Sequence, residues 1–379
     1  MNFPKNLTDK LETRNKNKSL RILPQPNDLI DFASNDYIGF SKSEMIFSET
    51  HQLLLDRNIK SNGATGSRLL SGNHSLYTET EKYIAKFHQT GSALLFNSGY
   101  DANVGFFSAV PQKGDLILYD ELCHASIRDG IQLSNAKSYK FKHNDFEDLD
   151  LLIHRNPDIL IYIVTESVFS MDGDCPNMEE LVAVSEKYNC YLVVDEAHAL
   201  GVFGEKGEGL IQQLQLQDKI FARIMTFGKG LGCHGAVVLG ADELKTYLVN
   251  FARSFIYTTG LSPHSVATIL MGYMHLERDK KAIELLRENI IFFNQVKKML
   301  YLSPLFVRSK SAIQSVIIPG NEKGKSIAAA LQENGFDVKA ILSPTVPVGQ
   351  ERLRFCIHSY NTKEDITKVL TLLSSFVFF

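Results

Sequence analysis

A lysine between two glycines, Lys229 in the segment Thr226-Phe227-Gly228-Lys229-Gly230, is the residue of this chain best suited to covalent chemistry. It follows the apolar pair Ile224-Met225, so we expect it at a tight turn after a strand, where glycine neighbours let the backbone approach a ligand closely. A lysine amine that is neutral part of the time can attack an aldehyde and form a Schiff base. An ordinary surface turn has the same composition, so the other polar segments must decide between the two interpretations.

A second segment, Asp195-Glu196-Ala197-His198, follows an apolar run at 191–194. Asp195 and His198 are three residues apart and can face one pocket. A buried carboxylate beside a Schiff-base lysine indicates pyridoxal phosphate, because the ring nitrogen of that cofactor needs an acidic partner to act as an electron sink. The acidic box of helicases has the same four letters, but it requires an upstream GxxxxGK[ST] phosphate loop, which this sequence lacks.

Two further elements suit a phosphate group. The segment Ser98-Gly99-Tyr100 lies between an expected strand and an expected helix, where free backbone N–H groups and the helix dipole favour a dianion. Thr226, three residues before Lys229, adds a hydroxyl. Together with the lysine and the aspartate, these groups predict a pyridoxal phosphate site.

Composition excludes several other classes of protein. The 40 basic and 43 acidic residues nearly balance, which gives no electrostatic case for binding nucleic acid or an anionic membrane. No run of about 18 apolar residues predicts a membrane span, and the polar first twenty residues lack a signal-peptide core, so we expect a cytoplasmic protein. The five scattered cysteines have neither metal-ligand spacing nor a disulfide pattern, so no metal site is expected.

Short apolar runs separated by segments of helical length predict an α/β fold with a mainly parallel sheet, covered on both faces. The expected strands are 93–96, 116–119, 160–164, 191–194, 224–227 and 236–239. Ligands bind at the carboxyl ends of such strands, and that is where the segments above are found. Asp120 to His124 and Thr165-Glu166-Ser167 also follow expected strands.

We expect three parts in the chain. Residues 1–45 form a helical arm, ended by Pro24 and Pro26, and a short strand at 29–32; residues 46–260 form the large α/β domain. Residues 261–379 form a smaller α+β domain. It begins with a long helical stretch from 263 to about 301, followed by strands at 313–318, 337–341 and 352–357 and by helices at 326–334 and 363–373.

Five segments, spread over most of the chain, resemble the α-oxoamine synthases, a branch of the fold type I pyridoxal phosphate enzymes. They are NDYIG at 35–39, LCHAS at 122–126, TESVFSMDGD at 165–174, VDEAH at 194–198 and TFGKG at 226–230. The resemblance implies the fold of that family, in which a large domain with a mainly parallel sheet precedes a smaller C-terminal α+β domain.

The resemblance also implies roles for individual residues. Lys229 becomes the Schiff-base lysine and later the general base, Asp195 the partner of the ring nitrogen, and His124 a catalytic residue that stacks on the ring. The other implied cofactor-binding residues are Gly99, Tyr100, Ser170, His198, Thr226 and Thr258. The implied substrate-binding residues are Arg21, Asn35, His124, Thr345 and Arg354.

Three of these roles have plain structural alternatives. His124 also fits a core histidine with satisfied hydrogen bonds, although its place beside a strand end favours a role. Arg354, implied to pair with the amino acid carboxylate, also fits a salt bridge within the small domain. Arg21 belongs to a basic arm that also fits a solvated surface. The sequence departs from the family pattern at 355–361, after Arg354, and at His234, after Lys229, which leaves the substrate preference open.

The reaction implied is a decarboxylative condensation of an amino acid with an acyl thioester. The member of the family that the chain resembles most joins L-alanine to a pimeloyl thioester, carried by coenzyme A or by an acyl carrier protein, in biotin synthesis. Sister enzymes that use glycine, or serine with a long acyl chain, are alternatives, and so is a non-catalytic partner subunit, although such subunits characteristically lack the lysine. The family further implies a homodimer with active sites at the interface, where Thr258 reaches the phosphate bound by the other copy.

Overall fold

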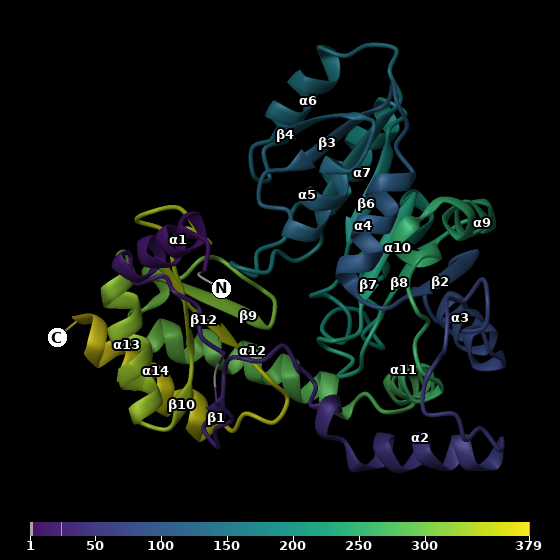
Figure 1. Cartoon of the computed structure of the whole chain (residues 1–379). Coiled ribbons are helices and arrows are strands. Elements are labelled where there is room, and N and C mark those ends of the chain that lie inside the picture. The colour runs from purple at the N-terminus through teal and green to yellow at the C-terminus, as the bar shows by residue number, and fades with distance from the viewer. Residues whose placement is uncertain (1–2, 24, 379) are drawn as a thin grey trace. The chain divides into compact units, whose positions relative to one another are not determined.

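The structure is a computed structural model that describes residues 3–23 and 25–378. Internal contacts divide the chain into two compact units. Unit 1 comprises residues 1–34, 171–174 and 286–379, and unit 2 comprises residues 35–170 and 175–285 (Figure 1).

This division differs from the expected boundaries at 45 and 260. Helix α11 (Pro263–Arg278), expected in the small domain, packs against α2 (Glu44–Asp56) and α3 (Ser75–Phe87), and so belongs to unit 2. Strand β1 (Ile30–Asp31) pairs with β10 (Phe336–Asp337), which joins the N-terminal segment to unit 1.

Unit 2 is built on a sheet that has seven strands within the described residues, in the order β2-β8-β7-β6-β5-β3-β4. The strands are β2 (Ser92–Phe96), β3 (Leu116–Asp120), β4 (Lys137–Phe141), β5 (Ile161–Glu166), β6 (Tyr191–Asp195), β7 (Ala222–Thr226) and β8 (Ala236–Gly240). Pairings from β7 through β4 are parallel, and β8 runs antiparallel to both of its neighbours. The prediction of a mainly parallel sheet is therefore confirmed.

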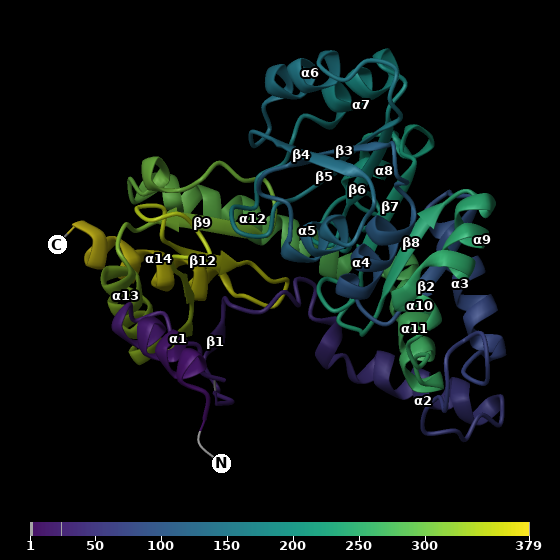
Figure 2. The same ribbon diagram turned by 45° about the horizontal axis from the view of Figure 1, so that its top comes forward.

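Helices cover both faces of this sheet, which explains why its central strands, such as β5 and β7, are buried along nearly their whole length (Figure 2). One core contains residues of α4 (Gly99–Ala109) and α5 (Ala125–Gln132), and the core on the other face contains residues of α6 (Phe146–His154) and α7 (Met178–Lys187). The remaining helices of unit 2 are α8 (Leu210–Gln213), α9 (Asp242–Phe251) and α10 (Arg253–Ile256), with short 3-10 helices at Phe40–Lys42 and Gln217–Lys219.

Strand β4 was not predicted, because it is an edge strand whose residues are largely exposed and polar. The helical stretch expected from 263 to about 301 is confirmed, and it consists of two helices, α11 and α12 (Lys281–Met299). Asp279 ends the first and its Oδ1 accepts a hydrogen bond of 2.9 Å from the Lys281 N–H, which is the usual task of a helix-starting carboxylate.

Unit 1 contains an antiparallel sheet, three-stranded in its described part, in the order β11-β12-β9. Its strands are β9 (Ile313–Ile317), β11 (Lys339–Ile341) and β12 (Arg352–Cys356); its helices are α1 (Lys5–Lys16), α13 (Asn321–Glu333) and α14 (Lys363–Phe378), with a 3-10 helix at Ser303–Leu305. The strand expected at 337–341 is interrupted at Val338, and helix α13 starts five residues earlier than expected.

The N-terminal arm is helical, as predicted, but its helix ends at Lys16 rather than at the prolines. Lys18 adopts a left-handed conformation (φ 50°), which stops the helix. Pro24 lies outside the described residues, and Pro26 is in an irregular segment. Within the described residues, no helix is both long enough and apolar enough to cross a membrane.

Candidate active site

Lys229 lies just after β7, at the carboxyl edge of the parallel part of the sheet, as predicted. Its Nζ atom is 2.9 Å from Nε2 of His198, and Nδ1 of His198 is 2.6 Å from the Tyr37 hydroxyl. Tyr37 is fully buried, so this row of three side chains leads from the interior of unit 2 to the lysine amine. Sequence reasoning gave Tyr37 no role, although it belongs to the matched segment 35–39.

The glycines around Lys229 make a tight turn possible. A Cβ atom on Gly230 would lie 2.1 Å from the Leu200 carbonyl oxygen, so this position admits only glycine. Gly232 has a left-handed φ of 63°, and its N–H donates to the Lys229 carbonyl at 2.8 Å. Close packing against the chain itself therefore explains Gly230 and Gly232. The Cβ position of Gly228 is uncrowded, with the Cys233 carbonyl oxygen at 3.6 Å.

The expected phosphate site lies at the start of a helix, next to the end of a strand. Gly99 begins α4, whose first N–H groups have no partner within the helix. A Cβ atom on Gly99 would lie 2.2 Å from Thr226 Oγ1, so the glycine keeps the end of β7 close to the start of the helix. The Tyr100 hydroxyl donates to Asp129 at 2.6 Å, which leaves the Tyr100 backbone N–H as its contribution to anion binding. These features fit the phosphate of pyridoxal phosphate.

The Asp195 carboxylate is buried and already hydrogen-bonded, with 5% of the residue exposed. Its Oδ1 accepts from the Ala197 N–H at 2.9 Å, and its Oδ2 accepts from the Asn103 side-chain amide at 2.8 Å. A buried carboxylate held in this way suits the protonated nitrogen of a pyridine ring. Asn103 was missed by sequence reasoning. The available signal was its position in α4, four residues after Gly99 and so on the same face of that helix.

A second buried carboxylate, Glu166, ends β5 in register with Asp195 on β6. Burial, followed by the charge of Asp195, raises the pKa of Glu166 to about 8. Its Oε1 accepts the backbone N–H of His124 at 2.6 Å, which fixes the start of α5. Partial burial of the imidazole, followed by the charge of Lys229, lowers the pKa of His124, so the neutral ring is favoured. Glu166 was noted at a strand end but was given no role.

The remaining predicted residues of unit 2 are spread around this edge of the sheet. Asn35 Oδ1 accepts from the Tyr37 hydroxyl at 3.2 Å, which places Asn35 beside the row that leads to Lys229. Thr258 Oγ1 accepts from the Asn97 amide at 3.0 Å, two residues before Gly99. Ser170 is partly buried and is the last residue of the first segment of unit 2, residues 35–170.

Three predicted substrate residues belong to unit 1, so their position relative to Lys229 stays a prediction. Arg354 lies on β12, opposite Ser315 on one neighbouring strand and Lys339 on the other. Arg21 is exposed, and its Nη2 donates to Thr345 Oγ1 across 3.5 Å, the outer limit of a hydrogen bond.

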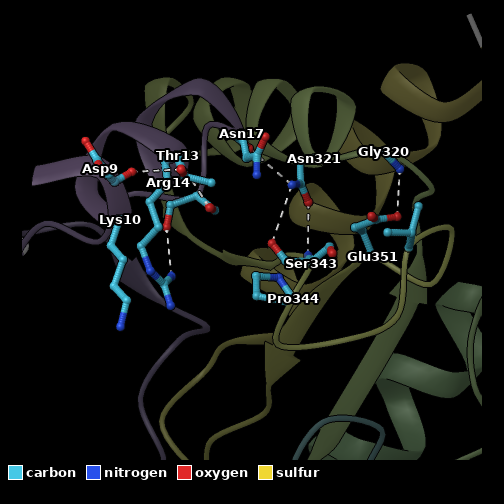
Figure 3. Close-up of a pocket in the computed structure, with 12 residues that line it drawn as sticks. Asp9, Lys10, Thr13, Arg14, Asn17, Gly320, Asn321, Ser343, Pro344 and Glu351 are labelled. Carbon is cyan, nitrogen blue, oxygen red and sulfur yellow. Dashed lines mark hydrogen bonds between the residues drawn. The ribbon is translucent and has the colours of Figure 1, made fainter. Parts of the chain in front are cut away.

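Unit 1 contains a large hollow (Figure 3). Two of its lining residues, Ser19 and Pro344, lie close in the sequence to Arg21 and Thr345. It has a volume of about 900 Å³, and α1 forms one wall with Lys10 and Arg14. The opposite wall is held by hydrogen bonds between Asn321 and Ser343, with Nδ2 donating to the Ser343 carbonyl and Oδ1 accepting the Ser343 N–H. In the described part of the chain, no group of three or more His, Cys, Asp or Glu residues could hold a metal ion.

Comparison with known proteins agrees with this geometry. A family model described as aminotransferase class I and II matches residues 27–373. The 8-amino-7-oxononanoate synthase of Emericella nidulans is 38% identical, over 95% of this chain and 92% of its own length. A protein of Methanococcus vannielii, described as a putative 8-amino-7-oxononanoate synthase, is 36% identical over 93% of both chains.

Solved structures with the same fold carry two different activities in their names. A serine palmitoyltransferase from S. paucimobilis, with a bound PLP-myriocin aldimine, matches with a TM-score of 0.88 and 27% identity, over 98% of this chain and 96% of that one. The 8-amino-7-oxononanoate synthase from Francisella tularensis matches with a TM-score of 0.78 and 31% identity, over 93% and 98%. The predicted fold, cofactor and enzyme class are thereby confirmed. The chain belongs to the aminotransferase class I and II family, within the α-oxoamine synthase branch of the pyridoxal phosphate enzymes.

Proposed function

We propose that this enzyme condenses L-alanine with a pimeloyl thioester, with loss of carbon dioxide, to give 8-amino-7-oxononanoate for biotin synthesis. The observation that carries this proposal is the 38% identity, over nearly the whole chain, to a relative of that name. The cluster of Lys229, His198 and Asp195 at one edge of the sheet supports catalysis by the chain itself. It argues against a non-catalytic partner subunit, which characteristically lacks the lysine.

Pyridoxal phosphate, when bound, supplies a protonated ring that withdraws electrons from the amino acid Cα. Lys229 would hold the cofactor through Nζ, and the same atom would take the Cα proton of the amino acid. His198 lies 2.9 Å from that amine, close enough to orient it. The buried Asp195 carboxylate keeps the ring nitrogen protonated.

The other cofactor contacts are proposed residue by residue. The Gly99 and Tyr100 N–H groups and the Thr226 hydroxyl bind the phosphate, and His124 stacks on the ring. Ser170 and His198 bind the side of the ring that carries the phenolic oxygen. These groups orient the cofactor and limit the access of water, so that proton transfer at Cα competes with side reactions.

On the substrate side, Arg354 pairs with the amino acid carboxylate through two parallel N–H donors, and Asn35 assists it. Arg21 and Thr345 contact the acyl thioester, for which the neighbouring hollow of unit 1 offers space. The acyl carrier is either coenzyme A or a carrier protein, because both present the same thioester.

Serine palmitoyltransferase activity is the second candidate, because those structures have the higher TM-scores. Sequence identity favours the first candidate, at 31% against 27% among these solved structures. The glycine-dependent sister reaction, which forms 2-amino-3-ketobutyrate, is a third possibility that no observation favours.

Steady-state assays of alanine, glycine and serine against acetyl, pimeloyl and palmitoyl thioesters separate these candidates. The proposal predicts the highest kcat/KM for alanine with a pimeloyl thioester, on at least one of the two carriers. A preference for serine with palmitoyl thioester, or for glycine with acetyl thioester, would refute it. The absorbance spectrum of the cofactor, with each amino acid added in turn, shows which one binds.

We further propose a cytoplasmic homodimer whose active sites lie at the interface, with Thr258 reaching the phosphate of the other copy. The five free cysteines support a reducing compartment. Sedimentation of the enzyme over a dilution series tests the dimer, and a fully active monomer would contradict it. Cell fractionation tests the location.

A further inference from the structure

Asn103, which belongs to none of the matched segments, uses both hydrogens of its side-chain amide inside the candidate active site. The residue lies in α4 and is 2% exposed. Its Nδ2 is 2.8 Å from Asp195 Oδ2 and 3.0 Å from Ser126 Oγ. An amide nitrogen carries two hydrogens, so it can donate both bonds at once.

The charge of Asp195 decides which way round this amide lies. In the opposite orientation, the Asn103 carbonyl oxygen would face a carboxylate oxygen at 2.8 Å, with no hydrogen between them. In the observed orientation, Asn103 Oδ1 is buried and finds no hydrogen-bond partner among the described residues. This arrangement is the less costly of the two, because the reversed one would replace the hydrogen bond to Asp195 by repulsion between two oxygen atoms.

The hydroxyl of Ser126 lies between the Asn103 amide and the His124 ring, so the hydrogen bond from Asn103 determines how Ser126 contacts His124. Its Oγ accepts a hydrogen from Asn103, so its own hydrogen can point to Nδ1 of His124, 2.8 Å away. The backbone N–H of Ser126 also donates to the same Nδ1, at 3.2 Å, and a backbone N–H cannot reverse its role. Nδ1 is therefore an acceptor, and the proton of the neutral imidazole lies on Nε2.

We propose that Asn103 and Ser126 are positioning residues that hold the Asp195 carboxylate in place and keep His124 neutral, with its proton on Nε2. The catalytic value of this network rests on the proposed function, in which His124 stacks on the cofactor ring. A neutral imidazole can stack on a ring whose nitrogen Asp195 keeps protonated, whereas an imidazolium would be repelled by that positive charge. The Asn103 amide thus holds Asp195, the partner of the ring nitrogen, and through Ser126 it keeps the stacked His124 ring neutral.

The protonation of His124 can be measured directly in the full-length protein, before and after loading with pyridoxal phosphate. Two-bond ¹H–¹⁵N correlation spectra of protein labelled with ¹⁵N-histidine distinguish protonated from unprotonated ring nitrogens, and the signals missing from His124→Gln identify this residue. We expect an unprotonated Nδ1 and a protonated Nε2 at neutral pH. Ser126→Ala removes one of the two donors to Nδ1, so the ratio of the two tautomers should change by about fivefold.

Ser185→Ala is the matched control, because Ser185 is also a buried helical serine, 3% exposed, whose hydroxyl donates only to the Val182 carbonyl at 2.8 Å. It should leave the His124 signals unchanged. Asn103→Leu removes both donors at similar volume and should weaken pyridoxal phosphate binding about tenfold in an absorbance titration. If circular dichroism shows that Asn103→Leu does not fold, Ser126→Ala decides alone.

A proton on Nδ1 in the wild type, or a Ser126→Ala spectrum identical to that of the wild type, would overturn the proposal. The expected spectra in an enzyme that fails to condense alanine with a pimeloyl thioester would refute the proposed function and leave the network standing. The spectra therefore test the hydrogen-bond network, and the activity assays test the proposed function independently.

Discussion

The residues proposed for the cofactor and those proposed for the substrates differ in how firmly their own unit holds them. Asp195 in unit 2 is 5% exposed and accepts two hydrogen bonds of 2.9 Å or less. Arg21 in unit 1 is exposed, and its side chain makes one hydrogen bond within the described residues, of 3.5 Å to Thr345. Because a side chain fixed by its neighbours loses little entropy on binding, the cofactor side is preorganised, whereas the acyl side must be ordered by its ligand.

The largest effect should come from a substitution at the centre of the preorganised cofactor site. Lys229→Ala removes the amine that binds the cofactor and moves the Cα proton, so kcat should fall by at least about 10³-fold. Steady-state assays and the cofactor absorbance spectrum measure this. Lys206→Ala, at a partly exposed lysine paired with Glu277, is the control. A Lys229→Ala enzyme with normal turnover would remove the basis of the proposed mechanism.

Asp195→Asn should come next, with a fall in kcat of roughly 10²-fold. The amide still offers Asn103 an acceptor oxygen, but it cannot keep the ring nitrogen protonated by charge. The measurement is kcat with saturating alanine. Asp115→Asn, at a turn before β3, is a control for the loss of a carboxylate elsewhere in unit 2.

Arg354→Lys tests whether the substrate side recognises a carboxylate through two parallel bonds. A lysine keeps the charge but not the fork of donors, so KM for L-alanine should rise about tenfold with a smaller change in kcat. If KM is unchanged, Arg354 is a structural residue of the small sheet, which was the alternative left open by its position on a strand.

Arg21→Ala should have a small effect, because an exposed charge contributes little. We expect KM for the pimeloyl thioester to rise about threefold at low ionic strength and less at high salt. Arg14→Ala, on the wall of the hollow, serves as the comparison. An effect as large as that of Asp195→Asn would mean that the acyl side is as firmly organised as the cofactor side.

Glu166→Gln should have the smallest effect on the enzyme. It tests the buried cofactor side through the stability of the folded protein rather than through its activity. The folded protein holds a proton on Glu166 up to a pKa of about 8, whereas the unfolded chain releases it near the ordinary value of 4.5. The free energy of unfolding therefore falls as the pH rises through this window. Glutamine keeps an acceptor for the His124 N–H and does not ionise.

The melting temperature of Glu166→Gln should therefore equal that of the wild type below pH 4.5 and exceed it by several degrees at pH 8. Glu186→Gln, which removes an exposed ion pair with Lys219, should show no such trend. A difference between Glu166→Gln and the wild type that does not change with pH would show that Glu166 is ionised throughout.

The sequence predicted the groups that follow strands better than the contacts between elements. Lys229 and Asp195 were found because strand ends are visible as apolar runs followed by polar residues, and His198 because it follows Asp195 in the chain. The contacts of Asn103 with Ser126 and Asp195 depend on how α4 packs against α5 and β6, which no local pattern encodes. The need for glycine at position 230 likewise comes from a carbonyl of a distant segment.

The errors in the fold have the same origin. Strand β4 pairs at the sheet edge and remains largely exposed, so its residues need not be apolar. The helical stretch at 263–301 was predicted correctly, but the break between α11 and α12 within it has no proline or glycine to mark it. The assignment of α11 to unit 2 follows from its packing on α2 and α3, which only the folded chain reveals.

The close approach of Gly99 to Thr226 also limits how this enzyme can evolve. Any side chain at position 99 would collide with the threonine hydroxyl, and turning that hydroxyl away to make room would remove it from the proposed phosphate site. Positions 99 and 226 can therefore not drift independently. A variant with alanine at the first position should persist only alongside a smaller residue at the second, which makes this pair a linked unit of selection.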